Sequence, residues 1–500
     1  MGFFDKITKK HNEGEAFTPE EERTQQHSDI AVGLDIGTTK IVAFAGKRNH
    51  NGEVEILGHS LRESIGVQRG QVINITETSN AINFVMNDLN KKLNMNVKDV
   101  MVGIAGQHIH SQRIYGDIKR NNPDDVITQE DINHLLEEMF KTPIDAGKQV
   151  LDVVPQEYII NTDIRTLEPK GITGRKLGSE FNIITGDINH IRNIGRCVKN
   201  SNLNMDSLIL EPIASSKVVL DEDEKEIGVA LVDIGGGTTD VIVFSDGVMR
   251  HSAVIPIASN VISDDIYTVF GGITRDKAEI LKIKHGSCMP DDSTKNHLIS
   301  IPGVHGRPPK TISELELANV IHSRMSEIIE RVVAELKNAK CMDMLGCGIV
   351  FTGGGSQLKG LKELAEFKTG LTVRIGYPEE KIKISNNEYK NPSFATGLGL
   401  MLLGIERNEA LYGYPDFNNS YFPEEETEEE KEFEEEDGNN TDTSSTKKGG
   451  KEGKGGDGGK KPDKPWLWER LKKILDSMLT DDSYLEDDNF DDDEYEDKEL

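Results

Sequence analysis

The sequence predicts an α/β protein with two related domains, and the main observation behind this prediction is a phrase that occurs twice. Residues 32–44 read VGLDIGTTKIVAF, and residues 231–244 read LVDIGGGTTDVIVF. Each copy has an apolar run, an Asp, a cluster of Gly and Thr, and a second apolar run. Short apolar runs bounded by turn residues are typical of buried strands. The repeat therefore predicts one β-hairpin with a Gly- and Thr-rich tip in each domain.

Length and composition are the second observation. The chain has 500 residues, of which 36% are hydrophobic, and strand-like runs alternate with helical ones from Ile30 to about Asn408. That is enough apolar material for more than one core. No run approaches the roughly 18 apolar residues of a membrane span, and the N-terminus has neither a signal-peptide core nor the Ser or Thr of a myristoylation site. We therefore expect a cytosolic chain whose four scattered cysteines are reduced thiols rather than zinc ligands: Cys197, Cys288, Cys341 and Cys347.

The acidic charge lies mostly near the C-terminus. Residues 424–437 hold eleven acidic residues and one Lys, and residues 480–500 hold twelve acidic residues and one Lys, within a net charge of −29. Such blocks repel themselves and are typical of disordered segments. Because no basic stripe balances them, we expect no nucleic-acid partner.

The tips of the two predicted hairpins have the chemistry of a phosphate site. Gly permits close backbone approach, so such a tip presents N–H groups and hydroxyls to an anion. The Asp before each tip, Asp35 or Asp233, can hold a hydrated Mg²⁺. Two facing hairpins would clamp one polyphosphate between the domains, and the alternative is that each is only a tight turn. The predicted phosphate contacts are Gly37, Thr38, Thr39 and Lys40 in the first hairpin and Gly235, Gly236, Gly237 and Thr238 in the second.

A third Gly cluster follows a different pattern. GIVFTGGGSQLKGLKELAEF (348–367) reads as a strand, a Gly triplet and a helix, with Ser356 as the expected N-cap. The triplet allows a nucleoside to approach the backbone closely. Its members are Gly353, Gly354 and Gly355, and the apolar face of the helix is Leu358, Leu361 and Leu364.

Taken in order, the three motifs resemble the phosphate-1, phosphate-2 and adenosine motifs of the actin, sugar-kinase and heat-shock-chaperone superfamily, over about residues 30–405. The resemblance implies an actin-like fold, which is a duplicated ribonuclease H-like architecture, with ATP and Mg²⁺ as ligands. It also implies that Glu211, in LEPIASSKVVL, positions the attacking water. In DKAEILKIKHG, Glu279 and Lys282 match positions that face the nucleoside in relatives.

An insert in the first domain distinguishes members of the superfamily. The segments VMVGIAGQHI, VLDVVPQEYIIN and RPPKTISELELANVIHSRMSEII resemble bacterial FtsA, and a helix TQEDINHLLEEMF capped by Thr128 is expected between strands of the insert. His108 and His110, two apart on an expected strand, favour ordinary strand histidines over a metal site. A small-molecule kinase or chaperone-type ATPase of the same fold is the enzyme alternative, although the chain shows neither a sugar-kinase base nor a chaperone substrate domain. An actin-like pilus-assembly protein is a third interpretation, although it would lack the amphipathic helix expected near the C-terminus.

The same resemblance divides the chain into predicted parts. The first actin-like domain comprises 29–85, 176–212 and 386–408, the inserted α+β subdomain comprises 86–175, and the second actin-like domain comprises 213–385 with a smaller subdomain at about 258–325. Outside them we expect a disordered leader at 1–28, a disordered acidic and Gly/Lys-rich linker at 409–464, an amphipathic helix at 465–479 and an acidic tail at 480–500.

The amphipathic helix is predicted from periodicity alone. In PWLWERLKKILDSML, at about 100° per residue, the apolar side chains share one arc and the charged ones fill the other. A bilayer interface suits such a helix, with Trp at the headgroups and Lys or Arg toward anionic lipid, and a protein groove is the alternative. The acidic tail departs from the family pattern, because anionic lipid would repel it. The apolar arc consists of Leu467, Trp468, Leu471, Ile474, Leu475, Met478 and Leu479, and Trp466 precedes it.

The resemblance to FtsA implies a protein that anchors the division ring to the membrane. It implies a weak ATPase at most, filaments of the protein itself, binding of the FtsZ C-terminal tail, and contacts with other divisome proteins. The implied location is the cytoplasmic side of the cell membrane at the division site, as a peripheral protein of Z ring assembly. In ANVIHSRMSEIIERV, Arg324 and Glu327 match positions that contact the FtsZ tail, and a solvated helix face is the alternative.

Overall fold

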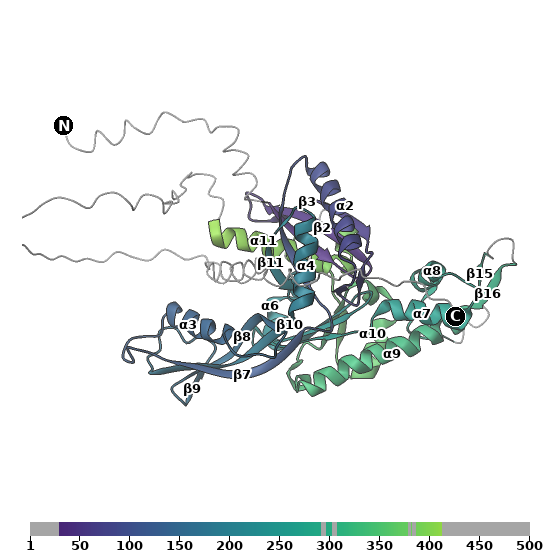
Figure 1. The fold of residues 1–500 in the computed structure, drawn as a ribbon. Coiled ribbons are helices and arrows are strands. Elements are labelled where there is room, and N and C mark those ends of the chain that lie inside the picture. Colours follow the sequence, from purple (N-terminus) through teal and green to yellow (C-terminus); the bar gives the residue numbers. More distant parts are fainter. Residues whose placement is uncertain (1–29, 292–296, 303–307, 379–381, 383–386, 413–500) are drawn as a thin grey trace, which may run out of the picture.

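The computed structural model describes residues 30–291, 297–302, 308–378, 382 and 387–412. The predicted leader, the amphipathic helix and the acidic tail lie outside these residues, as does almost all of the predicted linker. In Figure 1 the described chain forms two α/β halves, and an additional subdomain extends from them at the lower left. No helix in the described part of the chain is long and apolar enough to cross a membrane.

The first half contains a five-stranded mixed sheet with the spatial order β11-β6-β1-β2-β3. The first predicted hairpin is β1 and β2, which pair antiparallel, and β3 continues this meander. On the other side of β1, strands β6 and β11 pair parallel. Because helices cover the sheet, its central strands are continuous buried runs rather than alternating ones. The strands are β1 (Ala31–Ile36), β2 (Lys40–Arg48), β3 (Val54–Glu63), β6 (Asp99–Ile104) and β11 (Asn204–Leu210).

The second half repeats this sheet strand by strand. Its order is β14-β13-β12-β17-β18, the second predicted hairpin is β12 and β13, and the pairs again run antiparallel on one side and parallel on the other. The common order and directions confirm that the two predicted hairpins are equivalent parts of a duplicated fold. The strands are β12 (Val229–Ile234), β13 (Thr239–Ser245), β14 (Val248–Ile255), β17 (Ile349–Thr352) and β18 (Val373–Ile375).

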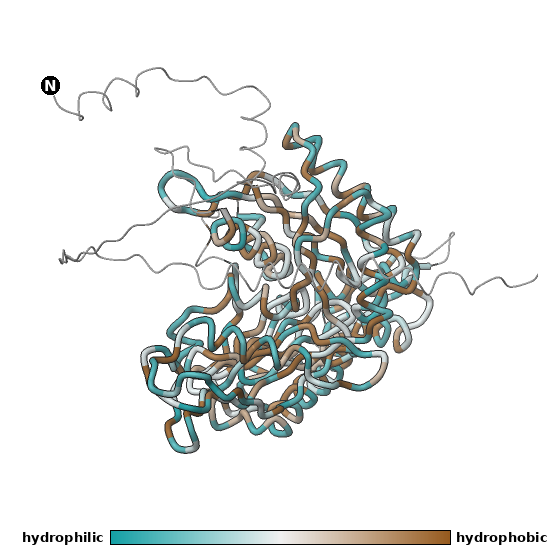
Figure 2. Tube along the Cα trace, turned by 60° about the vertical axis from the view of Figure 1, so that its left-hand side comes forward, coloured by the Kyte–Doolittle hydropathy of each residue, from teal (hydrophilic) through white to brown (hydrophobic). Residues whose placement is uncertain are grey.

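Helices pack on both sheets, and hydrophobic segments run through the interior strands while the outer turns are hydrophilic (Figure 2). In the first half, α11 packs on β1, β2 and β6 and against α5. Gly399 permits that helix contact, since a Cβ there would lie 1.9 Å from the carbonyl oxygen of Ala214. The first-half helices are α2 (Ile75–Leu93), α4 (Ile188–Asn200), α5 (Glu211–Val219) and α11 (Ala395–Tyr412), which continues past the predicted start of the linker. Two short strands, β4 (Val67–Gln68) and β5 (Gln71–Val72), form a separate hairpin.

The second half is extended by a helical part that contains the predicted smaller subdomain, about 258–325, and runs past it to Asn338. Helix α9 runs along α7 and α10, and α8 packs against α7 (Figure 1). A two-stranded hairpin, β15 and β16, precedes α9 in the chain. The elements of this half are α6 (Glu222–Ile227), α7 (Ser259–Phe270), α8 (Arg275–His285), β15 (Leu298–Ile301), β16 (Lys310–Ser313), α9 (Glu314–Asn338) and α10 (Leu361–Thr369). Short 3₁₀ turns are η3 (Met342–Met344), η4 (Gly354–Gln357), η5 (Asn387–Lys390) and η6 (Pro392–Phe394).

The inserted subdomain is an antiparallel sheet of order β7-β10-β8-β9 with one helix, α3. Thr128 caps α3 as predicted, in a reciprocal capping box with Asp131. The predicted limits of the insert, 86–175, differ from the strand pairing. Helix α2 and strand β6 belong to the first half, whereas β10 belongs to the insert, so both limits lie later in the chain. The elements are β7 (His110–Lys119), α3 (Gln129–Phe140), β8 (Lys148–Ile160), β9 (Ile164–Thr166) and β10 (Lys176–Asp187).

The insert contacts the second half as well as the first. Strands β7 and β8 lie against β14, the outer strand of the second sheet. The side-chain amide of Gln156 donates a buried hydrogen bond of 2.9 Å to the carbonyl oxygen of Met249 on β14. The insert therefore bridges the two halves at their edge.

Candidate functional site

The tips of the two hairpins have the same turn geometry and touch each other. In the first, Gly37 N–H donates to the carbonyl oxygen of Lys40 at 3.1 Å, and in the second, Gly235 N–H donates to that of Thr238 at 3.0 Å. A Cβ on Gly236 would lie only 1.9 Å from Thr39 Oγ1. A Cβ on Gly237 would lie 2.6 Å from Thr38 Oγ1. The second tip therefore requires glycine because the threonines of the first tip occupy the space.

Four carboxyl groups gather behind these tips. Asp35 and Asp233 are the next-to-last residues of β1 and β12, Asp240 lies opposite Asp233 on β13, and all three are buried. Glu211 opens α5 directly after β11. The place of Glu211 depends on Gly103, since a Cβ there would lie 2.9 Å from its side chain. The structure thus brings together the two predicted metal-binding aspartates and the predicted water-positioning glutamate.

The third Gly cluster borders the same carboxyl groups. Gly353 has φ +84°, and a Cβ on it would lie 2.2 Å from Asp233 Oδ1. The other oxygen of Asp233 accepts hydrogen bonds from Ser215 at 2.8 Å and from Thr396 at 3.4 Å. These residues belong to α5 and α11 of the first half, so Asp233 is held by elements from both halves.

Crowding and burial make the cluster hard to ionise. Burial raises the pKa of Asp35 to about 7, with a further contribution from Asp233, although Lys40 opposes the shift. Burial and the neighbouring carboxylates raise the pKa of Glu211 and of Asp240 well above the usual range. Burial also raises the pKa of Asp233, against the two hydrogen bonds that it accepts. The cluster therefore holds protons near neutral pH or takes up a cation.

Asp240 is the site residue that the sequence analysis missed. Its Oδ1 is buried without a hydrogen-bond partner among the described residues, while Oδ2 accepts from Thr238 Oγ1 at 3.3 Å. A buried carboxylate oxygen without a partner costs free energy, which a bound ion or water would recover. The sequence contained a clue to this residue, because the Thr-Thr pair of the first motif is followed by Lys40 and that of the second motif is followed by Asp240.

Lys40 is the cation of the site. It lies in β2, and its ammonium group donates to the carbonyl oxygen of Ser393 at 2.6 Å and to the hydroxyl at 3.0 Å. It also lies 4.0 Å above the ring of Phe394. Burial lowers the pKa of Lys40 to about 8. The turn η6 thus positions the ammonium group of Lys40 beside the first tip.

Glu279 and Lys282 reach the site indirectly. Lys282 is buried, lies 2.7 Å from Glu279 Oε2, and donates to the carbonyl oxygen of Ser259 at 3.0 Å. Ser259 opens α7, and its N–H and hydroxyl both donate to the carbonyl oxygen of Gly235. The pair on α8 therefore braces α7, which in turn supports the second tip.

Three local predictions need correction. Ser356 does not cap the helix that follows the Gly triplet, because it lies inside η4 and its hydroxyl donates to the carbonyl oxygen of Gly353 at 2.7 Å. Helix α10 starts only at Leu361, after Gly360 at φ +78°, so Leu358 lies outside it. His108 lies in a turn before β7 rather than on the strand, buried with its ring centre 4.6 Å from that of His190.

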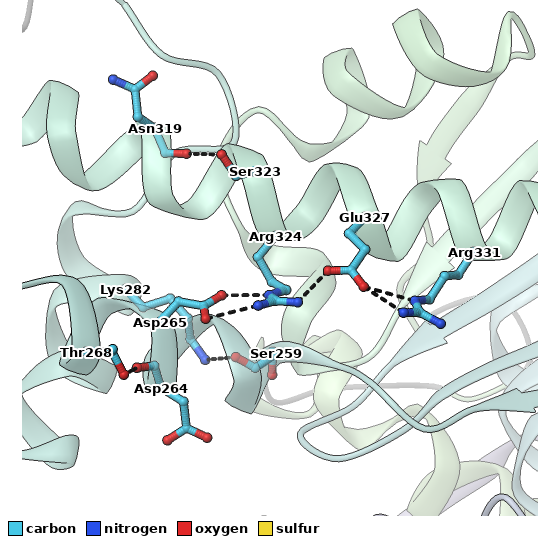
Figure 3. Close-up of polar contacts among 10 residues, drawn as sticks. All are labelled: Ser259, Asp264, Asp265, Thr268, Lys282, Asn319, Ser323, Arg324, Glu327 and Arg331. Atoms are coloured by element: carbon cyan, nitrogen blue, oxygen red, sulfur yellow. Dashed lines mark hydrogen bonds and ion pairs between the residues drawn. The ribbon is translucent and has the colours of Figure 1, made fainter.

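The predicted partner-binding residues lie on the face between α7 and α9 (Figure 3). Arg324 donates to both carboxylate oxygens of Asp265 on α7, at 2.6 and 3.0 Å, and also to Glu327. Glu327 accepts in turn from Arg331. Ion pairs between partly exposed side chains therefore cover this face, and a solvated helix face remains the alternative to a binding site.

Comparisons with known proteins add independent information. A family model described as "Cell division protein FtsA" matches residues 230–399, and one described as "SHS2 domain inserted in FTSA" matches residues 106–185, close to the limits of the inserted sheet. The chain is 35% identical over 400 residues to the cell division protein FtsA of Pseudomonas aeruginosa, covering 80% of this chain and 95% of that protein. It is 37% identical over 378 residues to the FtsA of Neisseria meningitidis serogroup B, covering 75% and 90%. Among solved structures, the PilM-PilN type IV pilus biogenesis complex has a similar fold, with a TM-score of 0.54 and 14% identity over 75% of this chain and 98% of that one.

Proposed function

Since the chain belongs to the FtsA family of cell division proteins, with the actin-like α/β fold predicted from its sequence, we propose that it binds ATP with Mg²⁺ and tethers FtsZ to the cell membrane. The observation that carries the nucleotide part is the pair of equivalent hairpins that meet over a buried carboxyl cluster. Each hairpin provides phosphate donors at its tip and one aspartate for the metal, and together they can hold one polyphosphate from two sides.

The residues present fit such a ligand. Asp35 and Asp233 would hold the hydrated Mg²⁺, which would neutralise the cluster and relieve the unpartnered oxygen of Asp240. The metal supplies positive charge beside the phosphates, and Lys40 supplies a second cation. The tips would donate N–H groups and hydroxyls to the phosphates.

Calorimetry of ATP binding tests this proposal directly. ATP should bind in the presence of Mg²⁺ and bind much more weakly with EDTA, because the phosphates would then meet an uncompensated carboxyl cluster. Equal affinity in the two conditions would contradict the proposed metal site. A coupled assay with candidate sugars serves as the control for the kinase alternative, since a scaffold should phosphorylate none of them.

We further propose that the FtsZ C-terminal tail docks on the face between α7 and α9. The proposal is supported by the resemblance of this segment to FtsA and by the orientation of Arg324 between the helices (Figure 3). Arg324→Glu should reduce the affinity for an FtsZ tail peptide, because the guanidinium is the only cation in that network that reaches both helices among the described residues. Unchanged affinity would discard this docking site.

The membrane anchor is proposed for residues 465–479, on the periodicity of their sequence. One such helix binds a bilayer weakly, so self-assembly into filaments would join many anchors and make attachment strong. Deleting 465–479 should abolish sedimentation with anionic liposomes and leave ATP binding intact. Liposomes should shift Trp466 and Trp468 emission to the blue, and Leu471→Glu with Ile474→Glu should prevent the shift. A wild-type protein that shows no shift would favour docking of the helix on another protein.

A further inference from the structure

On the face between α7 and α9, Arg324 is engaged in an ion pair within the protein. Asp265, on α7, is engaged bidentately by Arg324 with donor–acceptor distances of 2.6 and 3.0 Å. Arg–carboxylate pairs of this forked geometry are the strong form of charge-assisted hydrogen bond. The guanidinium of Arg324 is therefore already occupied by the type of group that an acidic peptide would offer.

The charges around this pair cancel. On α9, Glu327 takes a further hydrogen bond from Arg324 and two from Arg331. On α7, the neighbouring Asp264 pairs with Arg275, whose guanidinium also lies 5.1 Å from the Tyr267 ring. Since each arginine here has a carboxylate partner, a free acidic peptide would meet a face with little net attraction.

The ion pair between Arg324 and Asp265 is accessible enough for another carboxylate to take the place of Asp265. The side chains of Arg324 and Asp265 are 27% and 28% exposed, so neither is locked in the core. Because both side chains are partly exposed, water and salt compensate for part of the loss of this pair, so its net contribution is smaller than that of a buried pair of the same geometry. A peptide carboxylate can therefore replace Asp265 without a large structural change.

We propose that Asp265 sets the affinity of this face by occupying Arg324, and that a carboxylate of the docking peptide displaces it. This inference rests on the proposed docking of the FtsZ tail. Asp265 is a regulatory competitor rather than a contact of the peptide, and the bidentate Asp265–Arg324 geometry shows how the incoming carboxylate would bind. The exchange keeps the number of charge pairs constant and therefore makes docking weak and reversible.

The test compares two single-charge changes on the same helix in the full-length protein. Asp265→Asn removes the competitor, while Asp264→Asn removes an equal charge one residue away and leaves Arg324 paired. Binding of a synthetic FtsZ C-terminal peptide is measured by fluorescence anisotropy at two salt concentrations. Asp265→Asn should tighten binding by about two- to five-fold, the scale of a partly exposed ion pair, and steepen its salt dependence. Asp264→Asn should bind like the parent protein.

Three outcomes distinguish the competition by Asp265 from the docking site itself. If Arg324→Glu abolishes binding and only Asp265→Asn tightens it, the competition is supported. If Arg324→Glu abolishes binding but the two Asp variants behave alike, the competition is wrong while the docking site stands. If Arg324→Glu binds normally, both the docking site and the competition fail. Should Asp265→Asn lose thermal stability, the parent protein provides a second test with a peptide whose carboxylates are amidated. The proposed exchange requires a carboxylate, so an amidated peptide that binds as tightly as the free one would overturn the competition.

Discussion

The first hairpin turns through Thr38 and Thr39 and continues into Lys40, whereas the second turns through Gly236 and Gly237 and leads to Asp240. The two turns have the same backbone hydrogen bond, and the sheets behind them have the same strand order. The side chains of the two hairpins differ. The first turn carries two hydroxyls and is followed by the cation Lys40, whereas the second turn is bare backbone at Gly236 and Gly237, followed by the hydroxyl of Thr238 and by the carboxyl group of Asp240 in β13.

This difference shows that the duplicated hairpins fit together only because they have diverged. Two tips like the first would bring four threonines into the space that the glycines now leave open. Two tips like the second would leave the carboxyl cluster without Lys40. Because the two hairpins carry different side chains, equivalent substitutions in them should have unequal effects on ATP binding and on stability.

The largest effect is expected at Glu211, which belongs to neither hairpin but faces the carboxyl groups of both. Glu211→Ala should lower ATP turnover by about 100-fold or more, the scale of a lost general base or water-positioning group. ATP affinity should change little, since the proposed phosphate donors stay in place. Phosphate release measured beside calorimetry separates the two quantities. Turnover equal to that of the parent protein would remove Glu211 from the mechanism.

The next largest effect is a loss of ATP affinity, which should differ between the two aspartates. Asp233→Ala should weaken Mg²⁺-dependent ATP binding by about ten-fold or more, the cost of one charge-assisted contact. Asp35→Ala should cost less, because it frees Lys40 to interact with the phosphates. Titration calorimetry of both variants measures the difference. Equal losses would mean that the two hairpins contribute symmetrically, and an unchanged affinity in Asp233→Ala would discard the metal assignment.

A smaller effect follows from the contact between the tips. Gly236→Ala should lower the free energy of unfolding by about 1–3 kcal/mol, since the new Cβ overlaps Thr39 Oγ1. The double variant with Thr39→Ala should recover much of that loss, because the overlapping atom is gone. Urea denaturation of the four proteins gives the coupling. Additive losses would show that the tips do not touch in solution.

The smallest effect is a dependence on pH. Because burial raises the pKa of Asp35 to about 7, the folded state holds a proton that the unfolded state releases, so stability falls as pH rises toward and through that value. Below about pH 6.5, His108 opposes this trend, since burial lowers its pKa to about 4 and its folded form resists protonation. Without ligand, stability should therefore fall between about pH 6.5 and 7.5, by at most about 1.4 kcal/mol per pH unit for each such proton. Above that range Lys40 opposes the fall, because burial lowers its pKa to about 8 and the folded state then releases a proton that the unfolded state keeps.

Denaturation midpoints across that range provide the measurement for the pH effect. Asp35→Asn should flatten the fall, and Mg²⁺ with ATP should remove it by neutralising the cluster. A ligand-free stability that increases between about pH 6.5 and 7.5 would contradict the raised pKa of Asp35.

Local chemistry explains which predictions from the sequence succeeded. The hairpins follow from short apolar runs separated by Gly and Thr, and the capping box of α3 follows from the spacing of Thr128 and Asp131. Ser356 was assigned wrongly because the sequence does not show that a 3₁₀ turn and Gly360 separate the Gly triplet from α10. The predicted nucleotide contacts remain predictions, although the structure gathers most of them at the two tips.

The sequence by itself determined the repeated hairpin, the Asp at the end of each first strand and the tether-like composition of the C-terminal region, because strand periodicity, turn chemistry and charge are local properties. Only the tertiary structure decided that β6 completes the first sheet while β10 joins the insert, since parallel and long-range pairing leaves no mark on neighbouring residues. It also decided that Gly236 faces Thr39, that Asp240 joins the carboxyl cluster, and that Arg324 is occupied by Asp265. Each of these depends on how separate segments approach one another, and that is fixed by packing rather than by the order of residues.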